Sequence, residues 1–146
     1  MRAARGLIFL IVDDDPGDVL LIQDALEASG HARAVHIVAD GHEALAFLTR
    51  TGEHATAPRP DVVLLDLNLP GKDGRQVLAE TKADPRLASI PILVFTTSQD
   101  PADILAAYTM YANAYVNKPD TLDDFTAVVA RIGEFFAQVA ALPAAG

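Results

Sequence analysis

Cysteine is absent from the 146-residue sequence, which excludes disulfide bridges and thiolate metal sites. Basic residues are few: 11 Lys and Arg stand against 20 Asp and Glu, which gives a net charge of −9. A field of that sign repels nucleic-acid phosphates, so we expect no direct binding to DNA or RNA. No apolar run reaches the roughly 18–20 residues that a membrane span needs, so no membrane partner is expected.

The basic N-terminal stretch, Met1 to Gly6, is not expected to begin a signal peptide. The apolar run behind it, Leu7 to Val12, is short and ends in three aspartates, where a signal peptide needs a small-residue cleavage site. We therefore expect a soluble, cytoplasmic protein. A length of 146 residues suits one domain with one core. We predict a single domain over residues 1–146, with its core at about 7–138 and a short tail at 139–146.

Five short apolar runs, rich in β-branched residues, predict buried strands. They are Leu7–Val12, Val35–Val38, Val62–Leu65, Ile92–Phe95 and Ala114–Val116. A helix start follows each run, and these starts are Asp15-Pro16, Asp40-Gly41, the turn that ends at Gly74, Asp100-Pro101 and Thr121. The alternation predicts an α/β fold: a five-stranded parallel sheet, doubly wound in the order 2-1-3-4-5, with helices on both faces.

Polar side chains follow four of these strands. They are Asp13, Asp14 and Asp15, then Asp66, Thr96 and Lys118. In a doubly wound sheet the carboxyl ends of the strands share one edge, so we expect these side chains to meet in one crevice. Crowded carboxylates resist joint ionisation unless a cation is present, and hard oxygen ligands suit Mg²⁺. A lysine and a hydroxyl beside such an ion indicate phosphoryl chemistry.

Each of these residues alone has a simpler explanation. The aspartates before Pro16 are typical of a helix cap, and Asp66 is typical of an ordinary loop residue. Thr96 suits helix capping, Lys118 a solvated charge, and Tyr115 packing on an edge strand. Their joint occurrence at successive strand ends favours a common site, because all the simpler explanations would have to coincide.

The same residues lie in stretches that resemble bacterial receiver domains of two-component response regulators, from about Leu7 to Gln138. The matching stretches are Ile11–Pro16, Leu64–Gly74, Val94–Ser98 and Tyr115–Pro119. Within that family, the stretches that resemble regulators paired with bacterial phytochrome kinases are Thr97–Pro101, Ala112–Tyr115 and Lys118–Phe125. The resemblance implies a stand-alone, CheY-like response regulator whose partner is a sensor histidine kinase, and the stretches shared with phytochrome-associated regulators point to a bacteriophytochrome.

The resemblance also implies roles in phosphoryl transfer. Asp66 is the expected phosphoacceptor, Thr96 bonds the phosphoryl oxygen, and Lys118 pairs with the phosphoryl charge. Tyr115 is the expected aromatic switch, which turns inward when Thr96 moves. No turnover enzyme is expected, only Mg²⁺-dependent self-phosphorylation from a phosphodonor and slow self-dephosphorylation.

The expected cofactor is Mg²⁺. The resemblance implies that Asp13, Asp14, Asp66 and the backbone carbonyl of Asn68 hold the ion, while the additional Asp15 serves as a helix cap. Asn68 and Ser98 are the candidates for tuning hydrolysis of the phosphorylated form.

Output is expected by protein contact, with a downstream protein target or a phosphotransfer protein. We expect phosphorylation to remodel the face made by the fourth helix, the fifth strand and the last helix. The last helix has more apolar residues than one core face needs, and with Tyr108 and Tyr111 this predicts a homodimer. Its apolar residues are Phe125, Val128, Val129, Ile132, Phe135, Phe136 and Val139. A cis Lys118–Pro119 bond is also predicted, to aim the lysine into the site.

Two other classes stay open. A phosphohydrolase of the haloacid-dehalogenase kind is suggested by Asp13-x-Asp15, but Gly17 stands where that motif has Thr or Val. No acidic pair on a later strand follows Lys118 either. The second alternative is a pseudo-receiver, which has the fold without phosphorylation. The intact set of acids, threonine and lysine argues against it.

Overall fold

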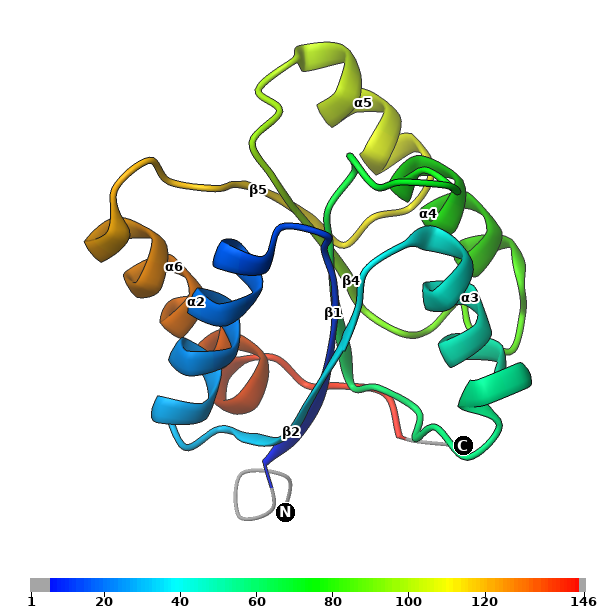
Figure 1. Ribbon diagram of the computed structural model, residues 1–146, viewed down its shortest axis with the longest axis horizontal. Coiled ribbons are helices and arrows are strands. Elements are labelled where there is room, and N and C mark those ends of the chain that lie inside the picture. Colours follow the sequence, from blue (N-terminus) through cyan, green and yellow to red (C-terminus); the bar gives the residue numbers. More distant parts are fainter. Residues whose placement is uncertain (1–5, 145–146) are drawn as a thin grey trace.

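The computed structural model describes residues 6–144, so residues 1–5 and 145–146, with the basic N-terminal stretch and the end of the predicted tail, lie outside the described residues. Within the described part, five strands form one parallel sheet in the order β2-β1-β3-β4-β5, which confirms the predicted topology (Figure 1). The strands are β1 Leu7–Val12, β2 Ala32–Val38, β3 Val62–Leu65, β4 Ile92–Thr96 and β5 Ala114–Asn117.

A helix follows every strand. The α-helices are α2 Pro16–Ala28, α3 Gly41–Thr49, α4 Gly74–Ala83, α5 Pro101–Thr109 and α6 Leu122–Glu134, with a 3-10 turn η1 Gly52–His54 and a π-helical turn η2 Phe135–Val139. Helices α2 and α6 cover one side of the sheet, and α3, α4 and α5 cover the other (Figure 1). None of the helices within residues 6–144 is long and apolar enough to cross a membrane.

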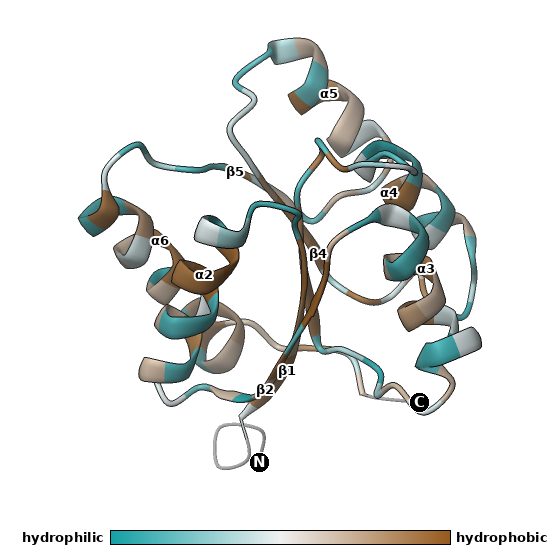
Figure 2. Cartoon of the chain, viewed as in Figure 1, coloured by the Kyte–Doolittle hydropathy of each residue, from teal (hydrophilic) through white to brown (hydrophobic). Residues whose placement is uncertain are grey.

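The core lies on both faces of the sheet. Phe9 and Ile11 of β1 pack into the cluster shared with α2 and α6. Leu10 and Val12, which point the other way, pack into the cluster shared with α3, α4 and α5. Because both faces are covered, β1 reads as an unbroken apolar run. Figure 2 shows this hydrophobic centre, with hydrophilic connections beyond the strands.

Polar caps fix where each helix begins. The side chains of Asp15, Asp40, Asp73, Asp100 and Thr121 each accept a hydrogen bond from a backbone N–H in the first turn of the helix that follows. These bonds satisfy donors that have no partner within the helix. The predicted caps Asp15 and Thr121 are confirmed, and the helix N-termini are thereby held beside the carboxyl ends of the strands.

Four element boundaries differ from the prediction, and two of them are small: β4 and β5 each run one residue further, to Thr96 and Asn117. Strand β2 begins at Ala32 and not at Val35, because its backbone pairs with β1 from Leu7 onward. The last α-helix ends at Glu134, and the chain continues through η2 up to Val139.

The prediction of a cis Lys118–Pro119 bond is wrong, because no peptide bond within the described residues is cis. The N–H of Lys118 donates to the carbonyl of Thr96 at 2.8 Å and continues the pairing of β5 with β4. An extended trans chain therefore already brings the lysine to the end of the sheet.

Candidate functional site

The Lys118 ammonium joins three carboxylates from different parts of the chain. Its Nζ donates to Asp13 Oδ2 at 2.8 Å, to Asp18 Oδ2 at 2.8 Å and to Asp66 Oδ2 at 2.9 Å. Asp13 follows β1, Asp66 follows β3 and Lys118 follows β5, and all three are buried. The structure thus brings together the acids and the lysine that the strand-end pattern predicted to meet.

This cluster holds one ammonium group and three carboxyl groups. Burial raises the pKa of Asp13, against the opposing effect of its hydrogen bond from Lys118. Burial alone would lower the pKa of the Lys118 ammonium, but hydrogen bonds to Asp13, Asp18 and Asp66 outweigh it and raise that pKa. Lys118 is therefore a permanent cation at neutral pH, and one ammonium is shared by three carboxyl groups.

The phosphoacceptor candidate Asp66 lies in a tightly held loop. Its N–H donates to the carbonyl of Val12 at 2.9 Å, and its Oδ1 accepts from the N–H of Asn68 at 3.2 Å. Gly74 packs directly against this loop, since a Cβ there would lie 2.2 Å from the Asp66 carbonyl oxygen. Only glycine fits this close approach, and the backbone of α4 at Gly74 thereby holds the Asp66 backbone in place.

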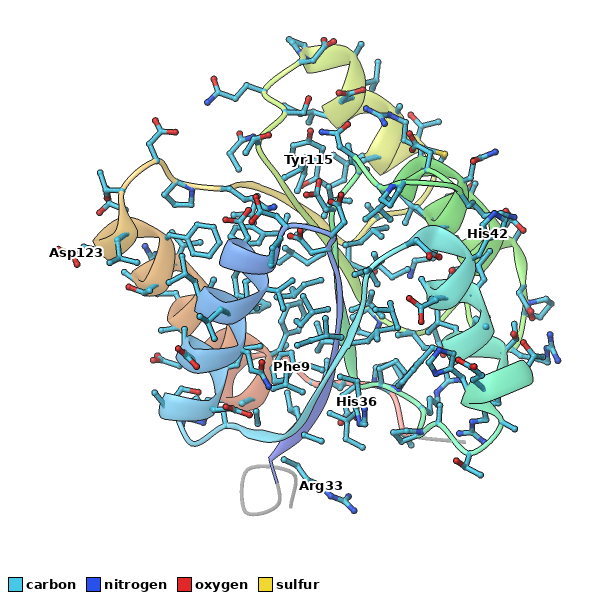
Figure 3. All side chains as sticks on the ribbon, viewed as in Figure 1. Phe9, Arg33, His36, His42, Tyr115 and Asp123 are labelled. Atoms are coloured by element: carbon cyan, nitrogen blue, oxygen red, sulfur yellow. The ribbon has the colours of Figure 1, made fainter. Side chains whose placement is uncertain are left out.

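Thr96 and Ser98 carry the second loop of the site. Thr96 is the last residue of β4 and is fully buried, and its Oγ1 accepts from the N–H of Ser98 at 3.4 Å. The carbonyl of Ser98 accepts from the Tyr115 hydroxyl at 2.9 Å and from Asn117 Nδ2 at 2.6 Å. Tyr115 lies close to α5 (Figure 3), and its N–H donates to the Tyr108 hydroxyl at 3.1 Å. The predicted switch pair, Thr96 and Tyr115, is therefore linked through Ser98.

The predicted metal ligands supply the right chemistry. Asp13 and Asp66 point oxygens at one cation, and Asp14 beside them is exposed. Carboxylate and carbonyl oxygens are hard ligands that suit Mg²⁺. In residues 6–144 no three His, Cys, Asp or Glu side chains form a ready-made metal cluster. The oxygens of Asp13 and Asp66 face Lys118. The residues fit a divalent ion by donor type.

Two features of the site were missed from the sequence. Asp18 joins the cluster from the first turn of α2, and the pattern of strand ends does not indicate it. Arg75 forms an ion pair with Asp103, which in turn accepts a hydrogen bond from Ser98. That contact joins α4 to α5, and no local sequence pattern indicates it.

A doubly wound sheet whose strand ends gather acidic residues, a threonine and a lysine defines a receiver. Residues 9–130 match the family described as the response regulator receiver domain, and the chain belongs to that family. This finding confirms the predicted family and fold, and argues against the haloacid-dehalogenase alternative.

Several known proteins resemble the chain along most of its length. Response regulator Rcp1 of Synechocystis sp. is 43% identical over 138 residues, which cover 94% of each protein. The crystal structure of the phosphorylated cyanobacterial phytochrome response regulator RcpA has 45% identity and a TM-score of 0.92, covering 95% of this chain and 99% of that one. The Mn²⁺-bound form of Rcp1 has 42% identity and a TM-score of 0.91, covering 94% and 99%. The predicted resemblance to phytochrome-associated regulators is confirmed.

Proposed function

We propose that this chain accepts a phosphoryl group on Asp66 from the phosphohistidine of a sensor kinase, in a Mg²⁺-dependent step. The observation that carries the proposal is the Lys118 ammonium, which bonds Asp13 and Asp66 at 2.8 and 2.9 Å. A cation held beside a buried carboxylate is in position to neutralise an incoming phosphoryl group. Thr96, buried at the end of the neighbouring strand β4, supplies a hydroxyl on the same edge of the sheet.

The transfer exchanges one bond for another. A carboxylate oxygen of Asp66 attacks phosphorus in line, the P–N bond to the kinase histidine breaks, and its electron pair returns to the imidazole. Lys118 pairs with the transferred oxygens, and Thr96 donates its hydroxyl to one of them. Water later breaks the P–O bond of the mixed anhydride. Each chain holds one phosphoryl group, so the protein is not a turnover enzyme in this proposal.

The ion that the proposal requires is Mg²⁺. Asp13, Asp14, Asp66 and the backbone carbonyl of Asn68 would hold it. When bound, it supplies positive charge for the phosphoryl oxygens. The similarity to Rcp1, of which a Mn²⁺-bound form is known, supports a divalent cation.

The proposed output begins at Thr96. When its hydroxyl moves to the phosphoryl group, the space that it leaves favours the inward position of Tyr115, which packs against the core cluster of α3, α4 and α5 and bonds the Ser98 carbonyl at 2.9 Å. The surface of α5, β5 and α6 changes as a result. Its reader is a downstream protein or a phosphotransfer protein. The relatives' names favour a phytochrome as the kinase, and we keep the prediction of a cytoplasmic location, where kinases have access to ATP.

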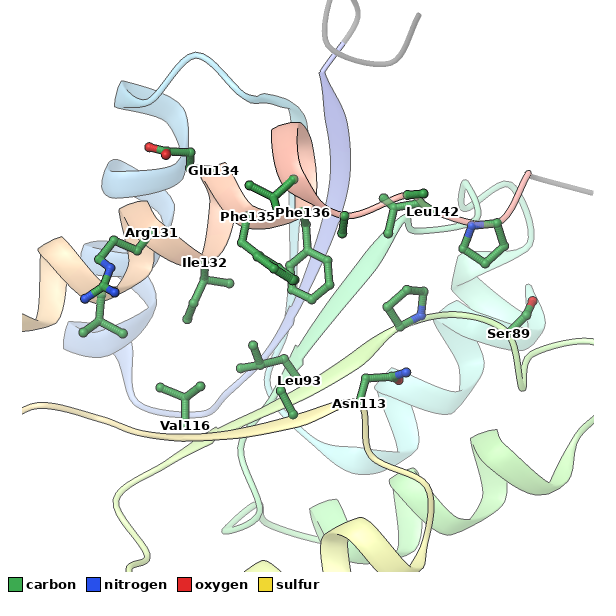
Figure 4. A pocket seen from close by; sticks show the side chains of 17 residues that line it. Ser89, Leu93, Asn113, Val116, Arg131, Ile132, Glu134, Phe135, Phe136 and Leu142 are labelled. Atoms are coloured by element: carbon green, nitrogen blue, oxygen red, sulfur yellow. The ribbon is translucent and has the colours of Figure 1, made fainter.

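We further propose a homodimer through α6 and η2. Phe135 and Val139 are 49% and 69% exposed, beside an apolar groove of about 860 Å³. Figure 4 shows this groove between η2 and the strands β4 and β5. Arg131 and Glu134 line it with opposite charges, which suits a two-fold interface. Sedimentation should give a dimer for the wild type and a monomer for Phe135→Ser; a wild-type monomer with or without phosphodonor would remove this proposal.

The test of phosphorylation is intact mass after incubation with acetyl phosphate and Mg²⁺, beside the Asp66→Asn variant. One added phosphoryl group, absent without Mg²⁺ and absent in the variant, is the expected result. No addition under any condition would favour the pseudo-receiver alternative. Sustained turnover of an aryl phosphate would favour a phosphohydrolase.

A further inference from the structure

A chain of polar contacts links the first turns of α4 and α5. Ser98 Oγ donates to Asp103 Oδ2 at 2.6 Å. The other carboxylate oxygen, Asp103 Oδ1, lies 2.9 Å from the Arg75 guanidinium, which also pairs with Asp73 at 3.0 Å. The Ser98 hydroxyl therefore has its single proton committed to Asp103.

The Asp103 carboxylate and the Arg75 guanidinium both favour their charged forms. The pKa of Asp103 is lowered by the hydrogen bond from Ser98 and by its bond with Arg75. Burial would lower the pKa of Arg75, but hydrogen bonds with Asp103 and Asp73 outweigh it and raise that pKa. The contact is thus a charge-assisted bond on both sides of the Asp103 carboxylate.

This series of contacts connects the two loops of the site. Its Arg75 end lies next to the loop that holds Asp66, and its Ser98 end lies in the loop after β4. Arg75 follows Gly74, which packs against the backbone of Asp66. Ser98 donates its N–H to Thr96 Oγ1 at 3.4 Å. A contact between Arg75 and Asp103 therefore ties the acceptor loop to the loop after β4.

We propose that Asp103 and Arg75 are positioning residues that turn the Ser98 hydroxyl away from the attacking water and so lengthen the lifetime of phosphorylated Asp66. The proposal rests on the proposed function. In hydrolysis the oxygen of water bonds to phosphorus, the P–O bond to Asp66 breaks, and the released proton passes to solvent. A Ser98 hydroxyl freed from Asp103 can bond that water and orient it. One held at 2.6 Å by a carboxylate has no proton left to donate.

The experiment follows loss of the phosphoryl group by intact mass, after labelling with acetyl phosphate and Mg²⁺ and removal of the donor. Asp103→Ala should lose the group about fivefold faster than the wild type, the rate equivalent of one ordinary hydrogen bond. Arg75→Ala, which leaves Ser98 bonded to a less firmly held Asp103, should accelerate loss by a smaller factor. Ser98→Ala and the double variant Ser98→Ala/Asp103→Ala should decay at one common rate, since the hydroxyl that Asp103 restrains is gone from both.

The matched control is Glu80→Ala on helix α4, which removes the 2.6 Å ion pair between Glu80 and Lys72 of the preceding loop and should leave the decay rate unchanged. If Asp103→Ala fails to fold, Asp103→Asn, which keeps an oxygen for Ser98 but loses the charge, is expected to show a smaller acceleration. Equal acceleration by Asp103→Ala in the Ser98→Ala background would show a structural effect and overturn the proposal. So would an unchanged decay rate in both Asp103 variants. A wild type that takes up no phosphoryl group would overturn the proposed function itself, and this inference with it.

Discussion

At the scale of residues, Lys118 organises the site. Its ammonium has three N–H donors and uses all of them on carboxylates. Asp13 and Asp66 could be predicted as its partners, because parallel strands end at one edge of the sheet. Asp18 could not, since which side of the first turn of α2 faces the sheet depends on packing with α6 and not on the strand pattern.

Removing Asp18 tests what the third carboxylate contributes. In Asp18→Ala, Lys118 loses one hydrogen bond that raises its pKa but keeps Asp13 and Asp66, so it stays protonated at neutral pH. We expect phosphorylation by acetyl phosphate to slow by about fivefold, because one N–H no longer fixes the ammonium. Asp24→Ala, an exposed position on the same helix, is the control for loss of charge. Equal rates for the two variants and the wild type would show that Asp13 and Asp66 suffice to hold Lys118.

Tyr111 is a second residue whose conformation calls for an explanation. Its φ is +69°, in the left-handed region, and its side chain is 75% exposed. A bulky residue there costs about 1–2 kcal/mol, and no buried contact repays the cost. Tyr111→Gly should therefore raise the free energy of unfolding by about 1 kcal/mol in a denaturant titration.

The matched comparison is Arg50→Gly, which relieves a similar φ of +58° at the end of α3. Both variants should gain stability, and Tyr111→Gly should leave the proposed dimer intact, because Tyr111 follows α5 and lies outside the α6–η2 interface. A loss of stability in Tyr111→Gly beside a gain in Arg50→Gly would show that the tyrosine side chain makes a stabilising contact.

At the scale of elements, the sequence predicts what a periodic pattern can encode. Apolar runs placed all five strands, and Asp or Thr caps placed the helix starts. The start of β2 was missed because Ala32-Arg33-Ala34 has no strand pattern and is held by backbone pairing to β1. The end of α6 was missed because the apolar spacing runs on through η2, where only the backbone hydrogen bonds change. The Arg75–Asp103 bond joins two helices, and nothing within either one indicates it.

Lys82 of α4 anchors the approach to β5. Its Nζ donates to the carbonyls of Ala88 and Ile90 at 3.0 and 2.9 Å and to Asn113 Oδ1 at 3.0 Å. Asn113 in turn accepts from the N–H of Ile92 at the start of β4. Lys82→Met keeps the apolar stem but leaves these acceptors without the ammonium, so we expect the free energy of unfolding at neutral pH to fall by about 2 kcal/mol.

The same lysine predicts a dependence of stability on pH. Burial lowers the pKa of Lys82 from its ordinary 10.5 in the folded protein. Between that lowered pKa and 10.5 the unfolded chain binds more protons than the folded one, so this group adds stability as pH rises through the window. Denaturant titrations at a series of alkaline pH values should show a wild-type stability that rises relative to Lys82→Met. Parallel curves for the two proteins would contradict the prediction.

At the scale of the whole molecule, the excess of acidic residues is most crowded at the site. The chain carries a net charge of −9, and at the strand ends three carboxyl groups share one ammonium beside the exposed Asp14. Such crowding is destabilising in the absence of a second cation. The molecule keeps a costly arrangement at this edge, and the cost is understandable if a divalent ion and a phosphoryl group bind there.

This cost predicts how Mg²⁺ changes thermal stability. A ligand that binds only the folded state adds about 2.7 kcal/mol at one hundred times its dissociation constant. For a chain of this size that corresponds to a rise in Tm of about 5–10 °C. Asp14→Asn is the informative variant, because the exposed Asp14 side chain does not support core packing. Without Mg²⁺ the variant should therefore fold with a Tm at or above that of the wild type. It should lose most of the Mg²⁺-dependent rise. Sodium chloride at matched ionic strength is the control that separates Mg²⁺ binding from charge screening. An equal rise in Tm with either salt, or an equal rise in both proteins, would assign the effect to screening and not to a site at Asp13, Asp14 and Asp66.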